Sequence, residues 1–275
     1  DNQDNLSEIH IPKRLFAHQM IEEAMILANI CAAKYIKKHI GYGIYRVHEE
    51  PEVLKIENLK KFFSLKGLSS KSFLKTIELI NGFIKHVNKD EGNKMMNILI
   101  LQTLKRAQYS TKEIGHFGLQ LKEYSHFTSP IRRYPDLVAH RLIKEILHKE
   151  IQKPNQERLE EELAELSSLE KRAEKSSRQV VQQMICHHLK QFVGDDFSAM
   201  IVGVTEFGLF CEIDNHYISG LIHVSDLRRD RYIFDKEANI LKGRKTGKTF
   251  KIGQKLTVKL ANVIPEQRKL VLVPK

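Results

Sequence analysis

Cysteine is scarce in this sequence, and so are glycine, proline and long apolar runs. The 275 residues include three cysteines, Cys31, Cys186 and Cys211, which are few, odd in number and far apart, so a disulfide framework is not expected. Fourteen glycines and seven prolines exclude collagen and long linkers, and 41% hydrophobic residues exclude wholesale disorder. The sequence therefore predicts a globular protein.

The sequence contains no pattern typical of a membrane span or a secretory leader. No apolar run approaches the roughly 18 residues that a bilayer-spanning helix needs. Residues 1–5 read Asp-Asn-Gln-Asp-Asn, whereas a signal peptide begins with a basic segment followed by an apolar one. We therefore expect a cytoplasmic protein without a membrane partner.

Positive charge is in excess. Forty-five Lys and Arg residues against 34 Asp and Glu residues give a formal net charge of +11. Such an excess favours an anionic partner, most simply nucleic acid, although it also keeps a protein soluble. Charge alone does not choose between these interpretations, so the motifs must decide.

The hydrophobic period changes near residue 194, from helical spacing to short β-branched runs. The length fits about two domains of roughly 100 to 200 residues each. We expect an α+β fold in which residues 1–193 are mainly helical and residues 194–275 form a five-stranded OB-fold barrel with a polar insert after the third strand. The predicted helices cover residues 17–39, 54–65, 72–86, 95–107, 135–149 and 156–191, and the predicted strands cover 197–205, 209–213, 218–224, 255–264 and 269–273.

A constrained loop with two arginines lies between the predicted helices. Residues 124–136 read Tyr-Ser-His-Phe-Thr-Ser-Pro-Ile-Arg-Arg-Tyr-Pro-Asp, and each proline pushes the residue before it towards extended geometry. Pro135 and Asp136 suit the first positions of the following helix. A guanidinium on such a loop can act as a planar, permanently charged clamp on a phosphate that gains negative charge during hydrolysis.

Aromatic and basic residues gather in the predicted barrel. Residues 207–210 read Phe-Gly-Leu-Phe, residues 220–223 read Gly-Leu-Ile-His, and residues 241–260 contain Lys and Arg but no acidic residue. Aromatic faces on a barrel surface stack on unpaired bases, and a basic groove follows the phosphates. The alternative is that Phe207 and Phe210 are buried core residues, as phenylalanines usually are.

Residues 194–274 resemble an S1-type RNA-binding domain through these two motifs and the closing strand that follows Arg268. The resemblance implies that Phe207, Phe210 and His223 stack on RNA bases and that Arg268 contacts the RNA backbone. One position departs from the family pattern, because Ile264 stands where an aspartate is common.

Four separated segments resemble, in the same order, the C-terminal half of the catalytic domain of the ribonuclease R and ribonuclease II family. The family consists of processive 3′-to-5′ exoribonucleases, so the resemblance implies hydrolysis of single-stranded RNA to nucleoside 5′-monophosphates. With the S1-type barrel, the segments extend the resemblance to nearly the whole chain. The four segments are residues 22–29, 45–49, 115–119 and 124–136.

The metal that the family uses has no matching ligands in this sequence. Family members hold Mg²⁺ with aspartates in the first half of the catalytic domain. Here Asp1 and Asp4 lie in a polar lead, and Asp90 and Glu91 lack the family's spacing. The resemblance therefore implies a C-terminal part that is inactive alone. The metal site and the cold-shock-type domains would lie upstream, and the full-length enzyme is expected to be a monomer.

The resemblance also assigns roles to individual residues of the helical part. Arg132 is expected to contact the scissile phosphate and Glu174 to act near the RNA end, both as catalytic residues. Glu22, Arg133 and Tyr134 are expected to bind RNA. Three alternatives stay open: an ion pair for Arg133, a solvated helix face for Glu174, and a favourable charge in the first turns of a helix for Glu22.

The histidines do not predict a metal site. His116, His126 and the pair His187-His188 have no carboxylate or thiolate at zinc-like spacing, since Cys186 is adjacent to His187 on a helix and points elsewhere. We expect these histidines to pack and to form hydrogen bonds.

Two other functions remain open from the sequence. A non-catalytic single-stranded RNA-binding module would bind RNA without releasing nucleotides. A duplex DNA-binding protein would need a recognition helix with base-reading side chains, for which the sequence offers no convincing candidate.

Overall fold

The computed structural model describes residue 9 and residues 13–64, 75–87, 94–214, 216, 218–227, 230–235 and 240–275. These residues fall into two compact units, one within Pro12–Lys89 and Met96–Ala173 and the other within Asp1–Ile11, Asp90–Met95 and Glu174–Lys275. We call them the helical unit and the barrel unit. In the described part of the chain, no helix is long and apolar enough to cross a membrane.

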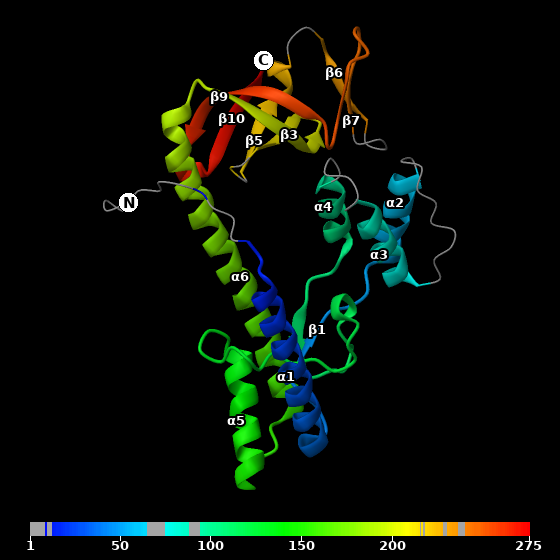
Figure 1. Ribbon diagram of the computed structural model, residues 1–275, viewed down its shortest axis with the longest axis vertical. Helices are drawn as coiled ribbons and strands as arrows, with labels where there is room; N and C mark the ends of the chain where they lie inside the picture. The colour runs from blue at the N-terminus through cyan, green and yellow to red at the C-terminus, as the bar shows by residue number, and fades with distance from the viewer. Residues whose placement is uncertain are drawn as a thin grey trace. The chain divides into compact units, whose positions relative to one another are not determined.

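The helical unit contains five α-helices, the start of a sixth, and a two-stranded sheet (Figure 1). Strands β1 (Tyr45–Val47) and β2 (Gln108–Ser110) pair in the antiparallel sense. A short 3-10 turn, η2 (Phe117–Leu119), follows β2. The helices are α1 (Phe16–Ile40), α2 (Val53–Ser64), α3 (Thr76–Val87), α4 (Lys94–Thr103), α5 (Tyr134–His148) and α6 (Gln156–Leu189).

Two large apolar cores and a small cluster of Ala33, Tyr45 and Val47 hold this unit together. The first lies where α1 and α5 run side by side, and the beginning of α6 completes it (Figure 1). The second joins α2, α3 and α4, where the rings of Phe63 and Phe83 stack with their centroids 3.9 Å apart. Burying such side chains contributes about 1.5 to 3 kcal/mol each.

The helices match the predictions with one clear difference. Helix α4 ends at Thr103, four residues before the predicted end at residue 107. The chain must be extended from Gln108 to pair with β1, so the helical period cannot continue up to that point. The predicted helix ends at residues 65 and 72 lie outside the described residues.

The barrel unit contains the five-stranded barrel that the sequence predicts, and its strands close in the order β10-β5-β4-β3-β9. Neighbouring strands are antiparallel except β5 and β10, which are parallel. Alternate residues point inwards, and Ile185, Cys186 and Leu189 of α6 join the barrel core. The barrel strands are β3 (Asp196–Thr205), β4 (Gly208–Ile213), β5 (Ser219–His223), β9 (Lys255–Ile264) and β10 (Lys269–Pro274).

The polar insert after the third barrel strand forms a sheet of its own, which the sequence did not predict. It consists of β6 (Tyr232–Asp235), β7 (Ile240–Gly243) and β8 (Thr249–Lys251) in the order β6-β7-β8. Leu241 and Phe250 are buried in the same core as the barrel residues. The insert is therefore packed against the barrel and holds its basic residues on ordered strands.

Two glycines let the barrel close. Gly208 has a φ of +153°, and a Cβ at this position would lie 2.1 Å from the carbonyl oxygen of Ile222. A Cβ on Gly220 would lie 2.6 Å from the Leu272 side chain, across the β5–β10 seam. Any larger residue would push these strands apart, because no real Cβ makes such contacts.

Candidate nucleic-acid interface

Helix α1 anchors the first half of the loop that precedes α5. The Asn29 side chain is 3% exposed and lies in the middle of this helix. Its Oδ1 accepts hydrogen bonds from the backbone N–H groups of Phe127 (2.9 Å) and Thr128 (3.2 Å), and its Nδ2 donates to the Tyr124 hydroxyl at 3.0 Å. One buried amide therefore satisfies backbone groups that a loop would otherwise leave unpaired.

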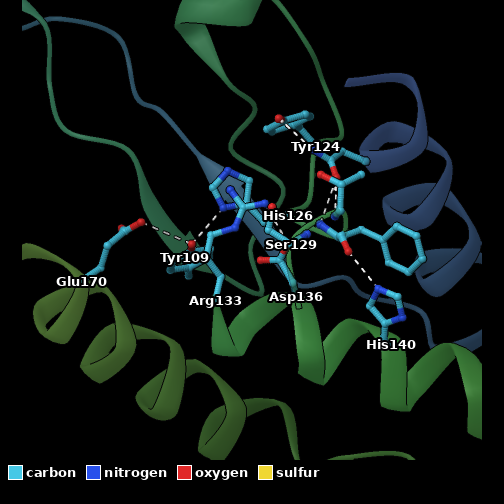
Figure 2. Close-up of polar contacts among 11 residues, drawn as sticks. Tyr109, Tyr124, His126, Ser129, Arg133, Asp136, His140 and Glu170 are labelled. Atoms are coloured by element: carbon cyan, nitrogen blue, oxygen red, sulfur yellow. Dashed lines mark hydrogen bonds and ion pairs between the residues drawn. The ribbon is translucent and has the colours of Figure 1, made fainter. Parts of the chain in front are cut away.

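Asp136 anchors the second half of the same loop. Its side chain is fully buried, and Oδ1 accepts from the backbone N–H of Ser129 at 2.8 Å and from Nη2 of Arg133 at 2.7 Å (Figure 2). A buried carboxylate needs such partners, because its desolvation costs several kcal/mol. Arg133 thus forms the ion pair that the sequence left as an alternative to contact with RNA.

His140 holds the loop against α5. Its ring stacks on Phe127 with centroids 4.0 Å apart, and its Nε2 lies 2.9 Å from the Phe127 carbonyl oxygen (Figure 2). The buried Ser125 hydroxyl donates to the carbonyl of Ile44, just before β1. The loop is therefore fixed by α1, β1 and α5 together.

The tip of this rigid loop is exposed. The Ile131, Arg132 and Tyr134 side chains face solvent, and Ile131 is fully exposed. The backbone N–H of Arg132 donates to the Ser129 carbonyl at 3.3 Å. Within the described residues, the Arg132 side chain forms no hydrogen bond or ion pair. Its guanidinium is therefore free to bind an anion near the positive N-terminal end of α5.

A polar network behind the loop was missed by the sequence analysis. The Tyr109 hydroxyl lies 2.8 Å from Nδ1 of His126 and 3.5 Å from Oε1 of Glu170, a residue of α6 (Figure 2). Arg46 of β1 donates to Oε2 of Glu170 at 2.6 Å, and its guanidinium carbon lies 4.5 Å from the Tyr109 ring centroid. These residues are far apart in the sequence, so no local spacing pattern could predict that they lie together.

Burial sets the protonation of this network. It raises the pKa of Tyr109 to about 12, so the hydroxyl keeps its proton at neutral pH. It also lowers the pKa of His126 to about 3, with a further contribution from the charges of Arg133 and Arg46, so the imidazole is neutral. The site therefore combines fixed cations with neutral hydrogen-bonding groups.

His116 and His48 of the helical unit form hydrogen bonds within the fold. Nδ1 of His116 accepts from the backbone N–H of Leu119, and Nδ1 of His48 accepts from Gly118. A Cβ on Gly118 would lie 3.0 Å from that Nδ1, so the close approach favours glycine. No group of three or more His, Cys, Asp or Glu side chains that could hold a metal ion occurs in the described part of the chain. The described residues do not fit the magnesium site that the family resemblance implies.

The two candidate glutamates lie on exposed helix surfaces. Helix α1 begins at Phe16 and has no acidic residue in its first turn, so Glu22 lies beyond the turn where the helix dipole favours a negative charge most. Glu22 instead pairs with Arg14. Glu174 of α6 accepts from Arg178 at 2.6 Å, and the side chains of both remain about half exposed.

On the barrel, three of the predicted stacking residues lie together on the outer face. Phe207 is 45% exposed, so its interpretation as a core residue is wrong. Phe210 lies on the outer side of β4, half-buried, with its ring over Gly203 and edge-to-face with Phe207 at 5.9 Å. Gly208 pairs with His223, which places the exposed His223 diagonally from Phe210 on the same face.

Arg268 does not join this aromatic group. It precedes β10, which runs parallel to β5 with Val271 opposite Leu221. Arg268 therefore lies level with the beginning of β5, whereas His223 lies at its end, roughly 15 Å away at about 3.3 Å per residue. The arginine has a φ of +55° and lies in the turn between β9 and β10.

The basic side chains of residues 241–260 are exposed, whereas apolar residues between them, such as Leu241 and Phe250, are buried. Asp230 fixes the turn between β7 and β8: its carboxylate accepts from the backbone N–H of Lys245 and from both the backbone and hydroxyl of Thr246. These hydrogen bonds, led by that of the Thr246 hydroxyl, hold the pKa of Asp230 well below its usual range. The exposed cations of the stretch are Lys242, Arg244, Lys245, Lys248, Lys251, Lys255 and Lys259.

The chain thus combines a helical part with a closed five-stranded barrel of the OB type, and each part carries exposed cations. The sequence matches the RNB domain over residues 1–149 and the S1 RNA binding domain over residues 190–273. The first match covers more than half of the chain, so the chain belongs to the RNB domain family.

The relatives in this family carry a more specific name. Ribonuclease R of Aquifex aeolicus is 37% identical over 267 residues, which is 94% of this chain and 37% of the relative. Ribonuclease R of Escherichia coli K12 is 34% identical over 286 residues, 96% of this chain and 34% of the relative. The chain thus spans about a third of the length of these curated relatives.

A solved structure shares the fold. RNase R of Mycoplasma genitalium, in complex with ribose methylated single-stranded RNA, superposes with a TM-score of 0.89 at 29% identity. The match covers 100% of this chain and 44% of that one. The likeness includes both the helical part and the barrel.

Proposed function

We propose that this chain forms part of a 3′-to-5′ exoribonuclease that hydrolyses single-stranded RNA to nucleoside 5′-monophosphates. The family membership and the relatives named ribonuclease R support this activity. The RNA in the Mycoplasma genitalium complex supports single-stranded RNA as the ligand. The observation that carries the proposal is the exposed Arg132 guanidinium on a loop held by two buried polar side chains.

In this proposal Arg132 contacts the scissile phosphate. Attack on the phosphorus places growing negative charge on the phosphate oxygens, and a fixed guanidinium stabilises that charge without having to reorganise. Glu174 acts near the RNA end, and Glu22 and Tyr134 bind the RNA. Arg133 can bind the RNA backbone only while it also holds the buried Asp136.

The barrel binds RNA outside the reacting centre. Phe207, Phe210 and His223 stack on bases, which contributes about 1 to 3 kcal/mol per base. The basic stretch of residues 241–260 follows the phosphates, and Arg268 contacts the backbone from the other end of β5. We assign residues 1–193 to the RNB-type part and residues 194–275 to the S1-type part.

The proposed cofactor, partner domains and cellular location concern the full-length enzyme. Mg²⁺ is proposed as the cofactor of the full-length enzyme, and the described residues do not form its site. The partners proposed are the upstream half of the catalytic domain and cold-shock-type domains, in a monomer that works in the cytoplasm.

Arg132→Ala tests the assigned role directly. In a protein that also carries the upstream half of the RNB domain, labelled RNA and Mg²⁺ should yield far less monophosphate after this substitution. Arg158→Ala, which removes a cation that is 81% exposed on α6, is the matched control and should leave the yield unchanged. Near-normal release by the Arg132→Ala protein would refute the role.

A non-catalytic single-stranded RNA-binding module is the second candidate. It is favoured by the arrangement of the described residues, in which no three His, Cys, Asp or Glu side chains are grouped so that they could hold a metal ion. The 275-residue chain alone should bind a single-stranded RNA oligonucleotide and release no nucleotides, whatever Mg²⁺ is added. Metal-dependent degradation by the purified chain would contradict this expectation.

A further inference from the structure

His126 has one ring nitrogen engaged and one open. Its Nδ1 lies 2.8 Å from the Tyr109 hydroxyl. Its Nε2 has no hydrogen-bond partner among the described residues. This atom is not fully buried, so it keeps access to solvent. His126 is partly buried, and because Nε2 keeps some exposure this nitrogen can be reached by a ligand.

The surroundings of Nδ1 determine which nitrogen carries the proton. The Tyr109 hydroxyl is protonated and 2.8 Å from Nδ1, whereas its 3.5 Å distance to Oε1 of Glu170 is too long for a strong hydrogen bond. The other carboxylate oxygen of Glu170 is engaged by Arg46. Tyr109 therefore donates to Nδ1, and the neutral ring carries its proton on Nε2.

The charges that face this ring are mostly positive. Arg132 and Arg133 of the loop and Arg46 of β1 all lie close enough to disfavour a second proton on His126. Neutral His116 and Tyr109 lie beside the ring, the Tyr124 ring packs edge-to-face against it, and Glu170 is the acidic group of the network. A neutral N–H donor among three guanidinium groups is complementary to an anion with several acceptor oxygens.

We propose that Nε2–H of His126 donates a hydrogen bond to a phosphate oxygen of the RNA strand that Arg132 contacts, with Tyr109 as the residue that positions the imidazole. This inference rests on the proposed function, because it uses the same RNA strand. It adds a neutral, directional N–H donor beside the cations of the loop.

The test follows the imidazole rings of the 275-residue chain by NMR, with ¹⁵N-labelled histidine and a single-stranded RNA oligonucleotide of about ten nucleotides. In the free protein the proton of His126 should lie on Nε2. When RNA is added, the pKa of His126 should rise by at least about one unit, a tenfold gain in proton affinity, because a phosphate favours the charged ring. An unchanged pKa would overturn the proposal.

His140 is the matched control within the same measurement. Its Nε2 is already paired with the Phe127 carbonyl, so its signals should respond little to RNA. Tyr109→Phe keeps the buried ring but removes the hydroxyl, and should allow the proton of His126 to distribute between both nitrogens. An unchanged Nε2 tautomer in this variant would contradict the positioning role of Tyr109.

Modified oligonucleotides identify the atom that is contacted. A DNA strand of the same sequence keeps the phosphates and should still raise the pKa of His126. A strand with uncharged methylphosphonate linkages should not. If RNA raises the pKa of His126 and the DNA strand does not, the contact is to a ribose hydroxyl, and the phosphate proposal is overturned.

Substitutions separate this proposal from the proposed function. His126→Ala should weaken RNA binding about tenfold or more, since it removes a hydrogen bond to a charged group. His126→Gln, which keeps an N–H donor, should recover much of that loss. If Arg132→Ala weakens binding and His126→Ala does not, only the His126 proposal fails. If neither substitution weakens binding, the proposed function of the loop fails as well.

Discussion

The loop before α5 and the outer face of the barrel expose their candidate RNA-binding groups by different means. Arg132 stands on an irregular segment whose backbone groups are bonded to the buried side chains of Asn29 and Asp136. Phe207, Phe210 and His223 lie on or beside regular strands, where pairing and glycines set their positions. A cation in an irregular loop needs a buried polar scaffold, whereas a stacking platform needs only strand register.

This difference predicts which substitutions unfold the protein and which remove only binding. The scaffold of the loop is internal, so its loss should be seen first in stability. The aromatic platform is external, so its loss should be seen in RNA affinity. The following tests are ordered from the largest expected effect to the smallest.

Asp136→Ala should have the largest effect. It leaves the Arg133 charge without its partner in a largely buried position and removes the bond to the Ser129 backbone. Breaking a buried pair in this way costs about 3 to 5 kcal/mol. The measurement is denaturant unfolding, with Glu162→Ala as the control. Glu162 forms an exposed pair with Arg158, so its loss should cost under about 1 kcal/mol. Equal costs would contradict the buried scaffold.

Gly208→Ala tests the barrel face in the same assay. The added Cβ would meet the Ile222 carbonyl oxygen at 2.1 Å, so β4 and β5 must separate locally. Gly247→Ala is the control, since Gly247 also has a positive φ of +67° but nothing within 4 Å. The control should cost about 1 kcal/mol from backbone strain, and Gly208→Ala clearly more. Similar losses for both would mean that the close approach does not restrain the strands.

Phe207→Ala should change binding more than stability. The ring is 45% exposed, and losing one stacked base costs about 1 to 3 kcal/mol, or roughly 5- to 150-fold in affinity. Fluorescence anisotropy with single-stranded RNA measures the affinity, and thermal unfolding measures the stability. An unaltered affinity would show that the outer aromatic group does not bind bases.

The pH dependence of stability should reveal the neutral histidines behind the loop. Burial lowers the pKa of His126 to about 3 and that of His116 to about 4. Between these values and about 6.5 the unfolded chain binds more protons, so stability falls as the pH decreases below about 6.5, by at most about 1.4 kcal/mol per pH unit for each ring. His126→Gln should reduce this slope. An identical slope in the variant would contradict a buried neutral imidazole.

The fold was predictable from the sequence because its signals are local. Helical spacing and short β-branched runs follow from neighbours a few residues apart, and they predicted the helices and the five barrel strands of the described parts. The predicted end of helix α4 was wrong, because the following residues must be extended to pair with β1. The insert sheet β6-β7-β8 was missed because its polar strands lack a clear alternating pattern.

The candidate site was predictable only in part. The prolines and arginines of the loop are visible in the sequence, and so are the aromatic motifs of the barrel. The network of Arg46, Tyr109 and Glu170 joins residues 61 to 124 positions apart, which no local pattern connects. Likewise, only the tertiary structure shows that Arg133 forms an ion pair with Asp136 while Arg132 is exposed.

The salt dependence of RNA binding tests the central claim, that Arg132 on its rigid loop contacts an RNA phosphate. The affinity of the 275-residue chain for a single-stranded RNA oligonucleotide is measured across a series of salt concentrations, for the unchanged protein and for Arg132→Ala. Losing one phosphate contact should reduce the steepness of the log-log plot by about 0.7 and lower the affinity at every salt concentration. Superimposable plots for the two proteins would contradict the claim.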